Sequence, residues 1–275
     1  MLNEQELIKN NRILNTKTHI AELISENINH VIKQDQSTTV PLFLRIKPGF
    51  IENLTKKIIN NPEKSIVIGV AGESASGKTT LARNTVKTCL SDNKELYTVI
   101  AGDDYFHDWS KELAEAGSFK ALFERGYNFD VPDAINLDLM REHIIQLTEG
   151  YTIRSPKYDF VTCASIADGE IKKPAKVILT EGLFSLNPKL RNILDIAIYV
   201  HTPHEVIKER WYKRAASRGK TPQDMDAQFS IVSKEAQKHI RPTMQTADII
   251  VNGLTSGEYI EFIADKIINA IKDAI

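Results

Sequence analysis

Five short apolar segments recur between residues 65 and 251, and polar or turn-forming residues bound each of them. They span residues 65–71, 96–101, 176–180, 195–200 and 247–251. Runs of this length that are rich in Val, Ile and Leu are typical of buried parallel strands. Helical spacing of apolar residues follows them at 79–90, 111–126, 135–148, 205–218 and 257–274. This alternation predicts an α/β fold with a doubly wound parallel sheet of about five strands.

The first 64 residues follow a different pattern. Residues 3–34 are polar with Ile and Leu at helical spacing, and residues 50–60 predict a second helix that stops before Pro62. We therefore expect an N-terminal helical extension, which either packs on the main domain or forms a dimer-contact or regulatory arm. Pro156 lies within the segment 153–160, so we expect that segment at a sheet edge.

A glycine-containing segment joins the first predicted strand to its helix. Its sequence is Gly72-Glu73-Ser74-Ala75-Ser76-Gly77-Lys78-Thr79-Thr80. It fits G-x-x-x-x-G-K-[ST], in which backbone N–H groups and the positive end of a helix dipole surround a polyphosphate. In that motif Lys78 reaches the β- and γ-phosphates and the Thr79 hydroxyl binds Mg²⁺. The alternative is an ordinary turn, but the strand and helix around the motif favour ATP binding.

Acidic residues follow two of the predicted strands. Asp103 and Asp104 come just after residues 96–101, and Glu181 follows 176–180. Open α/β sheets bind ligands beyond the carboxyl ends of their strands, so these carboxylates can reach a bound nucleotide. Asp103 is a candidate general base with Asp104 as its competitor, and Glu181 is a candidate Mg²⁺ partner. A helix cap and a capped strand end are the respective alternatives.

Three further features each allow two interpretations. The predicted helix at 205–218 is dense in Lys and Arg, and it is either a solvated face or a lid over the phosphates. Asp130 and Asp133 either bind sugar hydroxyls or cap the following helix. Tyr158 either stacks on an aromatic ring or belongs to the core.

Composition limits the classes of partner. The chain has 275 residues, 42% of them hydrophobic, and a formal net charge of -1. This balance gives no basic footprint for nucleic acid and no polybasic membrane contact. Residues 1–10 lack the charged-then-apolar pattern of a signal peptide, and no apolar run approaches membrane-spanning length. Cys89 and Cys163 lack metal-ligand spacing. We expect a cytoplasmic protein with a small-molecule substrate; self-association into a homo-oligomer stays open.

Several motifs in order resemble the uridine/cytidine kinases of the uridine kinase–phosphoribulokinase group. They cover residues 65 to about 253 and are GESASGKTT, GDDYF, NFDVPDA, YDFVT, VILTEG, RWYKRAASRGKT and RPTMQTADIIVNG. The resemblance implies a P-loop kinase domain over 65–275 with a lid at about 204–222, preceded by an extension over 1–64. It implies ATP and Mg²⁺ as cofactors and a hydroxyl of a small, sugar-like metabolite as acceptor.

The resemblance also implies a role for each matching residue. Asp103 resembles the catalytic carboxylate, and Thr79, Asp103 and Glu181 resemble the Mg²⁺ environment. Asp130 matches the ribose ligand, Tyr158 the aromatic residue at the pyrimidine, and Gln228 a glutamine at the sugar. The lid cations near the phosphates are matched by Arg210, Lys213 and Arg218.

Four positions depart from the family pattern. Cys163 stands where the family has the histidine that contacts the base edge, and Ser165 replaces an arginine. Phe106 replaces a tyrosine and Lys220 replaces an arginine. A thiol is a weak hydrogen-bond partner, so the departures weaken the uridine assignment more than the kinase assignment. Uridine or cytidine 5′-phosphorylation is the leading hypothesis, followed by a related kinase with another acceptor and by a nucleotide-binding regulator without turnover.

Overall fold

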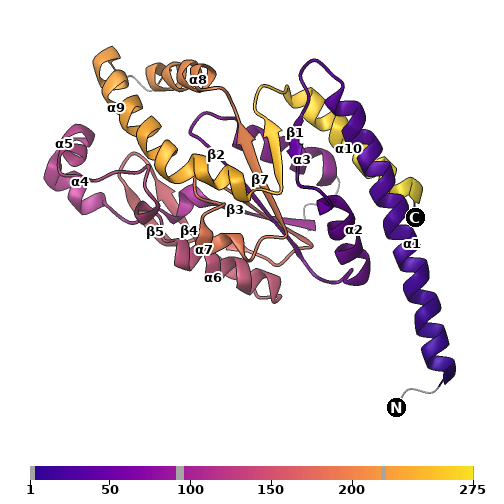
Figure 1. Cartoon of the computed structure of the whole chain (residues 1–275). Helices are drawn as coiled ribbons and strands as arrows, with labels where there is room; N and C mark the ends of the chain where they lie inside the picture. Colours follow the sequence, from indigo (N-terminus) through magenta and orange to yellow (C-terminus); the bar gives the residue numbers. More distant parts are fainter. Residues whose placement is uncertain (1–3, 91–95, 218–220, 275) are drawn as a thin grey trace.

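The computed structural model describes residues 4–90, 96–217 and 221–274. Its centre is a six-stranded sheet with the strand order β1-β8-β7-β2-β6-β3 (Figure 1). The parallel strands are β2 (Ile66–Gly72), β3 (Tyr97–Ala101), β6 (Val177–Glu181), β7 (Ile196–His201) and β8 (Ile249–Asn252). The predicted α/β fold with a mainly parallel sheet is confirmed.

Helices cover both faces of this sheet, because the strand side chains alternate between two apolar clusters. Along β7, Ala197 and Tyr199 belong to one cluster, whereas Ile196, Ile198 and Val200 belong to the other. The first cluster packs against α6 (Leu137–Thr148) and α7 (Pro188–Arg191). The second packs against α1 (Glu4–Gln36), α2 (Phe50–Asn60), α3 (Lys78–Leu90) and α10 (Gly257–Ala274).

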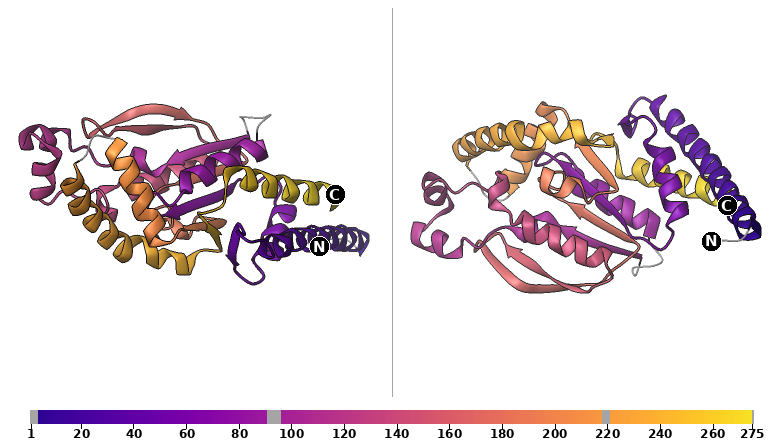
Figure 2. Two further views of the ribbon diagram at one scale, coloured as in Figure 1. Left: turned by 90° about the horizontal axis from the view of Figure 1, so that it is seen from above. Right: turned by 60° about the horizontal axis from the view of Figure 1, so that its bottom comes forward.

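The N-terminal region contributes two helices, α1 and α2, and one strand of the central sheet. The second half of α1 packs beside α2 and α10, and Figure 2 shows α1 and α10 together at one end of the molecule. Asp35 then accepts backbone hydrogen bonds from Leu42 and from Phe43, the first residue of β1 (Phe43–Ile46). The strand pairs antiparallel with β8. The division between residues 1–64 and 65–275 stays a prediction, and β1 joins the two parts through the sheet.

A second, smaller sheet lies apart from the first. Strand β4 (Ile153–Asp159) pairs antiparallel with β5 (Ala164–Lys172), and their register shifts between Ser155 and Lys157. Pro156 sits at this irregularity, where no ladder N–H is needed. The edge position predicted for residues 153–160 is therefore confirmed, since each strand of a two-stranded sheet has an open side.

The remaining α-helices lie toward the side of the molecule opposite α1 (Figure 1). They are α4 (Ser110–Ala116), α5 (Phe119–Glu124), α8 (His204–Ser217) and α9 (Pro222–Glu235). A separate apolar cluster centred on Trp211 and Phe229 joins α8 to α9, and Ala75 of the glycine-containing loop packs against it. The predicted lid at about 204–222 covers α8 and reaches the first residue of α9, and its residues 218–220 lie outside the described ranges. Within the described ranges, no helix is both long and apolar enough to cross a membrane.

Candidate active site

The register of the central sheet brings the predicted acidic residues to one place. Glu181, the last residue of β6, pairs with Val70 of β2 on one side and with Ala101 of β3 on the other. The glycine-containing loop follows β2 and Asp103 follows β3. All three segments therefore leave the sheet side by side at its carboxyl edge, as their positions in the sequence predict.

The loop itself has the backbone of a tight anion-binding turn. Ala75 and Gly77 have φ angles of 68° and 100°, and the Ser76 N–H donates to the Glu73 carbonyl at 3.0 Å. The Thr202 hydroxyl supports the loop by donating a hydrogen bond to the Ser76 carbonyl at 2.8 Å. Gly253 lies so close that an added Cβ would stand 2.4 Å from that same carbonyl oxygen.

Two of the predicted magnesium ligands are in contact. The Thr79 hydroxyl donates to Glu181 Oε2 at 3.2 Å. Burial is the main reason that the pKa of Glu181 is raised; Lys78 opposes this effect and Asp103 adds to it. Hydroxyl and carboxylate oxygens are hard ligands of the kind Mg²⁺ prefers, so these residues fit the ion that the motif implies.

Asp103 and Asp104 have different environments, although they are adjacent. Asp104 is 9% exposed and forms an ion pair with Lys157 at 3.1 Å. Asp103 is exposed at the carboxyl edge and lies near enough to Glu181 and Asp130 to raise the pKa of each. Asp104 is thus committed to a structural contact, and Asp103 faces the site.

Asp130 lies among the charges of the site. Burial is the largest effect and raises its pKa to about 6. Arg214 and Lys78 lower this pKa, whereas Glu235 and Asp103 raise it. A half-buried carboxylate thus lies within electrostatic reach of the lysine of the loop and the candidate base.

The predicted lid cations occupy different positions. Arg210 donates to the Gly253 carbonyl at 2.9 Å. Arg214, for which the sequence predicted no role, donates to the Ser74 hydroxyl at 2.6 Å. Lys213 does not join these two arginines at the loop. Its side chain is 75% exposed and forms an ion pair with Glu209 at 2.6 Å.

Of the other predicted site residues in this region, the structure describes Gln228 and not Arg218 or Lys220. Gln228 lies half-buried on α9. Arg218 and Lys220 fall outside the described residues, so their predicted roles stay predictions.

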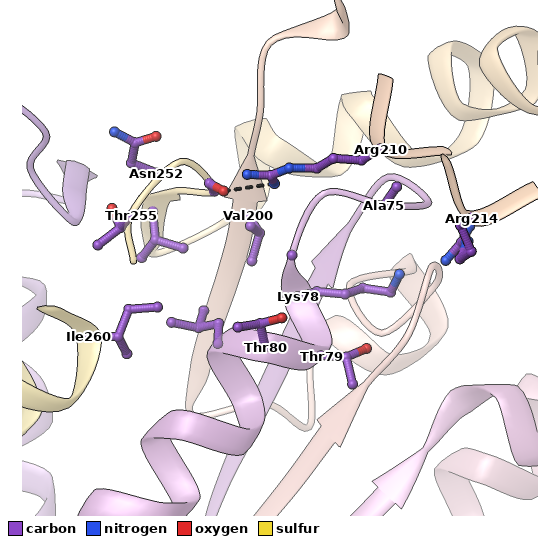
Figure 3. Close-up of a pocket in the computed structure, with 14 residues that line it drawn as sticks. Ala75, Lys78, Thr79, Thr80, Val200, Arg210, Arg214, Asn252, Thr255 and Ile260 are labelled. Carbon is purple, nitrogen blue, oxygen red and sulfur yellow. Dashed lines mark hydrogen bonds between the residues drawn. The ribbon is translucent and has the colours of Figure 1, made fainter. Parts of the chain in front are cut away.

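A cavity of ≈ 370 Å³ lies beside the loop (Figure 3). One wall is the loop and the start of α3; the opposite wall is the connection from β8 to α10. The lining residues not predicted from the sequence include Asn252, Gly253, Thr255 and Ile260. Polar residues directly after a predicted strand, in the sequence DIIVNG, were the signal that could have identified Asn252 and Gly253.

The predicted ring-binding residues belong to an aromatic cluster. The ring of Phe106 lies 5.3 Å from that of Tyr158 and 5.5 Å from that of Phe129. Tyr158 is buried, and burial, followed by the neighbouring Cys163 thiol, raises its pKa. Cys163 is fully buried with a φ of 56°, and burial raises its pKa too, which keeps it a neutral thiol.

Comparison with known proteins supports the same reading. The model of the Phosphoribulokinase / Uridine kinase family matches residues 67–258. A uridine kinase of Shewanella frigidimarina is 33% identical over 195 residues, which is 70% of this chain and 89% of that protein. A uridine kinase of Halobacterium salinarum is 33% identical over 207 residues, or 74% and 87% of the two chains.

Among solved structures, a candidate fructose transport system kinase from Silicibacter sp. TM1040 superimposes with a TM-score of 0.51 at 21% identity. The match covers 68% of this chain and 90% of that one. At this identity the likeness concerns the fold alone.

Proposed function

We propose a specific acceptor for this chain, which belongs to the phosphoribulokinase/uridine kinase family and is an ATP-dependent kinase of an alcohol group. The proposed reaction is phosphorylation of uridine or cytidine at the 5′-hydroxyl. The observation that carries it is the position of Asp130, a half-buried carboxylate within electrostatic reach of Lys78 and Asp103. A carboxylate so placed can accept hydrogen bonds from ribose hydroxyls beside the transferred phosphate.

The proposal assigns the donor side to the loop and its neighbours. Backbone N–H groups of residues 72–80 bind the phosphates, and Lys78 contacts the β- and γ-phosphates. Arg210 and Arg214 add positive charge from α8. Thr79 and Glu181, with Asp103, would hold Mg²⁺, which when bound neutralises charge on the phosphate oxygens.

On the acceptor side, Asp103 orients the 5′-hydroxyl and accepts its proton, a role typically worth about 10²–10⁴-fold in rate. Asp130 binds the sugar with Gln228 from α9. Tyr158 faces the pyrimidine from the aromatic cluster, next to Phe106. The assignment of Asp103 rests on its position at the carboxyl edge and on the family motif, and that of Asp130 on its charged neighbours and the motif. The assignments of Gln228 and Tyr158 rest on the family motif.

A different acceptor within the same reaction class is the second candidate, and Cys163 favours it. The thiol has no exposed surface and belongs to the same buried cluster as Phe106 and Tyr158. It cannot offer a pyrimidine edge the donor or acceptor that a histidine provides. A sugar phosphate or a pantothenate-like alcohol would need no such contact.

An acceptor screen with ADP release as the readout tests the proposal. Uridine, cytidine, other nucleosides, sugar phosphates and pantothenate-like alcohols are compared at equal concentration. We expect turnover with uridine or cytidine, its loss in Lys78→Ala, and its retention in Lys111→Ala, where the side chain is 84% exposed. If only another alcohol is phosphorylated, that alcohol takes the place of uridine and cytidine as the proposed acceptor. Full turnover in Lys78→Ala would refute the phosphate-loop assignment.

A further inference from the structure

The glycine-containing loop holds a buried acid. Glu73, the only acidic residue among residues 72–80, is 8% exposed. Its two carboxylate oxygens accept hydrogen bonds from Arg241, at 2.9 Å from Nε and 3.1 Å from Nη2. The Arg241 guanidinium also lies 3.3 Å from Nδ1 of His204, the first residue of α8.

This carboxylate is unfavourable for the function of the loop unless it is neutralised. The loop is built to receive a polyphosphate, and a second anion beside it opposes binding, since charge interactions are strong at a partly buried site. The two hydrogen bonds from the Arg241 guanidinium neutralise the carboxylate and fix its orientation. The Glu73 carbonyl also accepts the Ser76 N–H, so the side chain and the backbone turn are held together.

Arg241 comes from a part of the chain distant in sequence. It begins a 3₁₀-helix, Arg241–Thr246, which follows α9 and the π-helix Ala236–Ile240. Its contacts with Glu73 and His204 therefore fasten the loop to the segment after α9 and to the start of α8. The hydrogen bonds from Thr202 and Arg214 to the loop end at the Ser76 carbonyl and the Ser74 hydroxyl.

We propose that Arg241 is a positioning residue for nucleotide binding, which neutralises and orients Glu73 so that the loop can accept the phosphates of ATP. This inference rests on the ATP site of the proposed function and is independent of the acceptor. It predicts that loss of Arg241 harms ATP binding through the charge left on Glu73. Removing that charge should then restore binding.

The test measures the Kd of a fluorescent ATP analogue, with no acceptor present, in four proteins. Relative to wild type, Arg241→Met should raise Kd about 10-fold, which corresponds to about 1.4 kcal/mol. The double variant Glu73→Gln with Arg241→Met should return to within about 3-fold of wild type, a residual of about 0.6 kcal/mol. Glu73→Gln alone should bind at least as well as wild type, because it leaves a cation beside the phosphates.

A matched ion pair elsewhere in the fold provides the control. Arg191 donates to both oxygens of Asp248 at 2.8 and 2.9 Å, at the amino ends of β7 and β8 and thus opposite the loop. Arg191→Met should lower Tm and leave Kd unchanged. If Arg241→Met does not fold, Arg241→Lys with and without Glu73→Gln is compared instead.

Two results would overturn the inference. The first is a Kd for Arg241→Met that rises no more than that of Arg191→Met. The second is a double variant that binds as weakly as Arg241→Met, because the effect would then be structural and not electrostatic. Failure of wild type itself to bind the analogue would refute the ATP site, and the inference with it, so the two failures are distinguishable.

Discussion

Asp103 and Asp104 are adjacent in sequence, and their environments predict opposite consequences of mutation. Asp103→Asn should retain ATP binding and lose about 10²–10⁴-fold in kcat, because the amide cannot accept the acceptor's proton. Asp104→Asn should keep most of kcat and lose some stability, since it weakens the ion pair with Lys157. Steady-state kinetics and thermal unfolding of both variants make the comparison. A larger kcat loss in Asp104→Asn would show that the neighbour is the catalytic group.

The raised pKa of Asp130 gives a dependence on pH. The pKa is about 6 in the folded protein against a usual value of 3.8, so the folded state binds its proton more tightly than the unfolded state does. The carboxyl is therefore neutral and tolerated below pH 3.8. As the pH rises from 3.8 to 6, its charge progressively lowers the free energy of unfolding. Above pH 6 this loss reaches about 3 kcal/mol.

Asp130→Asn should therefore raise the free energy of unfolding at pH 7.5, by roughly 1–3 kcal/mol, and leave it nearly unchanged at pH 3.5. It should also weaken acceptor binding, and wild-type kcat/KM for the acceptor should fall as pH drops through 6. Urea unfolding at the two pH values, with the 75% exposed Asp138→Asn as control, tests the first part. Equal effects of Asp130→Asn at both pH values would contradict the assignment of this pKa.

The sequence could not show which of two neighbouring residues faces the site, because this depends on the direction of each side chain. Lys213 and Arg214 are adjacent in the cationic run, yet Lys213 pairs with Glu209 in solvent while Arg214 turns to the loop. Composition cannot distinguish them, because the helix surface each one occupies depends on how α8 sits over the sheet. The burial of Cys163 depends likewise on the two-stranded sheet, which was not predicted.

At the scale of elements, Asp35 connects the N-terminal helix to the central sheet. It is 1% exposed, and its carboxylate accepts from the backbone N–H groups of Leu42 and Phe43 at 3.0 and 2.9 Å. Asp35→Ala would leave two buried donors without this partner, which costs roughly 1–3 kcal/mol for each unsatisfied group. We expect a clear loss of unfolding free energy with little change in KM for ATP, and little effect of Gln36→Ala, an exposed neighbour. No loss of stability in Asp35→Ala would show that water replaces the carboxylate.

The elements that were predicted share strong local signals, and the ones that were missed lack them. The five parallel strands are continuous apolar runs, and α2 begins and ends where its pattern predicts. Strand β5 is mostly exposed and contains Asp168-Gly169, which is a turn signal. The structure needs glycine at position 169, because a Cβ added there would stand 2.5 Å from the Cβ of Lys157. Helix α9 was missed although Pro222 at its first position is a helix-start signal.

At the scale of the whole molecule, the binding loop is held by residues from three separate parts of the chain. Thr202 follows β7, Arg214 lies on α8 and Arg241 follows α9. The sequence predicted the loop from its own motif, whereas these supports required the fold, since they are separated from the loop by more than a hundred residues. The cradle for the nucleotide is therefore a property of the assembled molecule.

The two halves of α1 predict different results for two truncations. In the second half, Ile24, Ile28, Val31 and Ile32 are buried in the cluster shared with α2 and α10. Each such side chain contributes roughly 1.5–3 kcal/mol, so removing all four would cost about 6–12 kcal/mol, comparable to the whole stability of a domain. In the first half, Ile8, Ile13 and Leu14 are 55%, 48% and 52% exposed.

A chain that lacks residues 1–18 should therefore keep its Tm and its kinase activity, and it should lose any self-association that the exposed half of α1 supports. A chain that lacks residues 1–34 should unfold or lose activity, because it exposes the apolar surface that α1 covers. Sedimentation equilibrium, thermal unfolding and ADP release in the full chain and both truncations decide between these outcomes. If removal of residues 1–18 abolished activity with no change in sedimenting mass, the exposed half of α1 would have a part in catalysis and not in association.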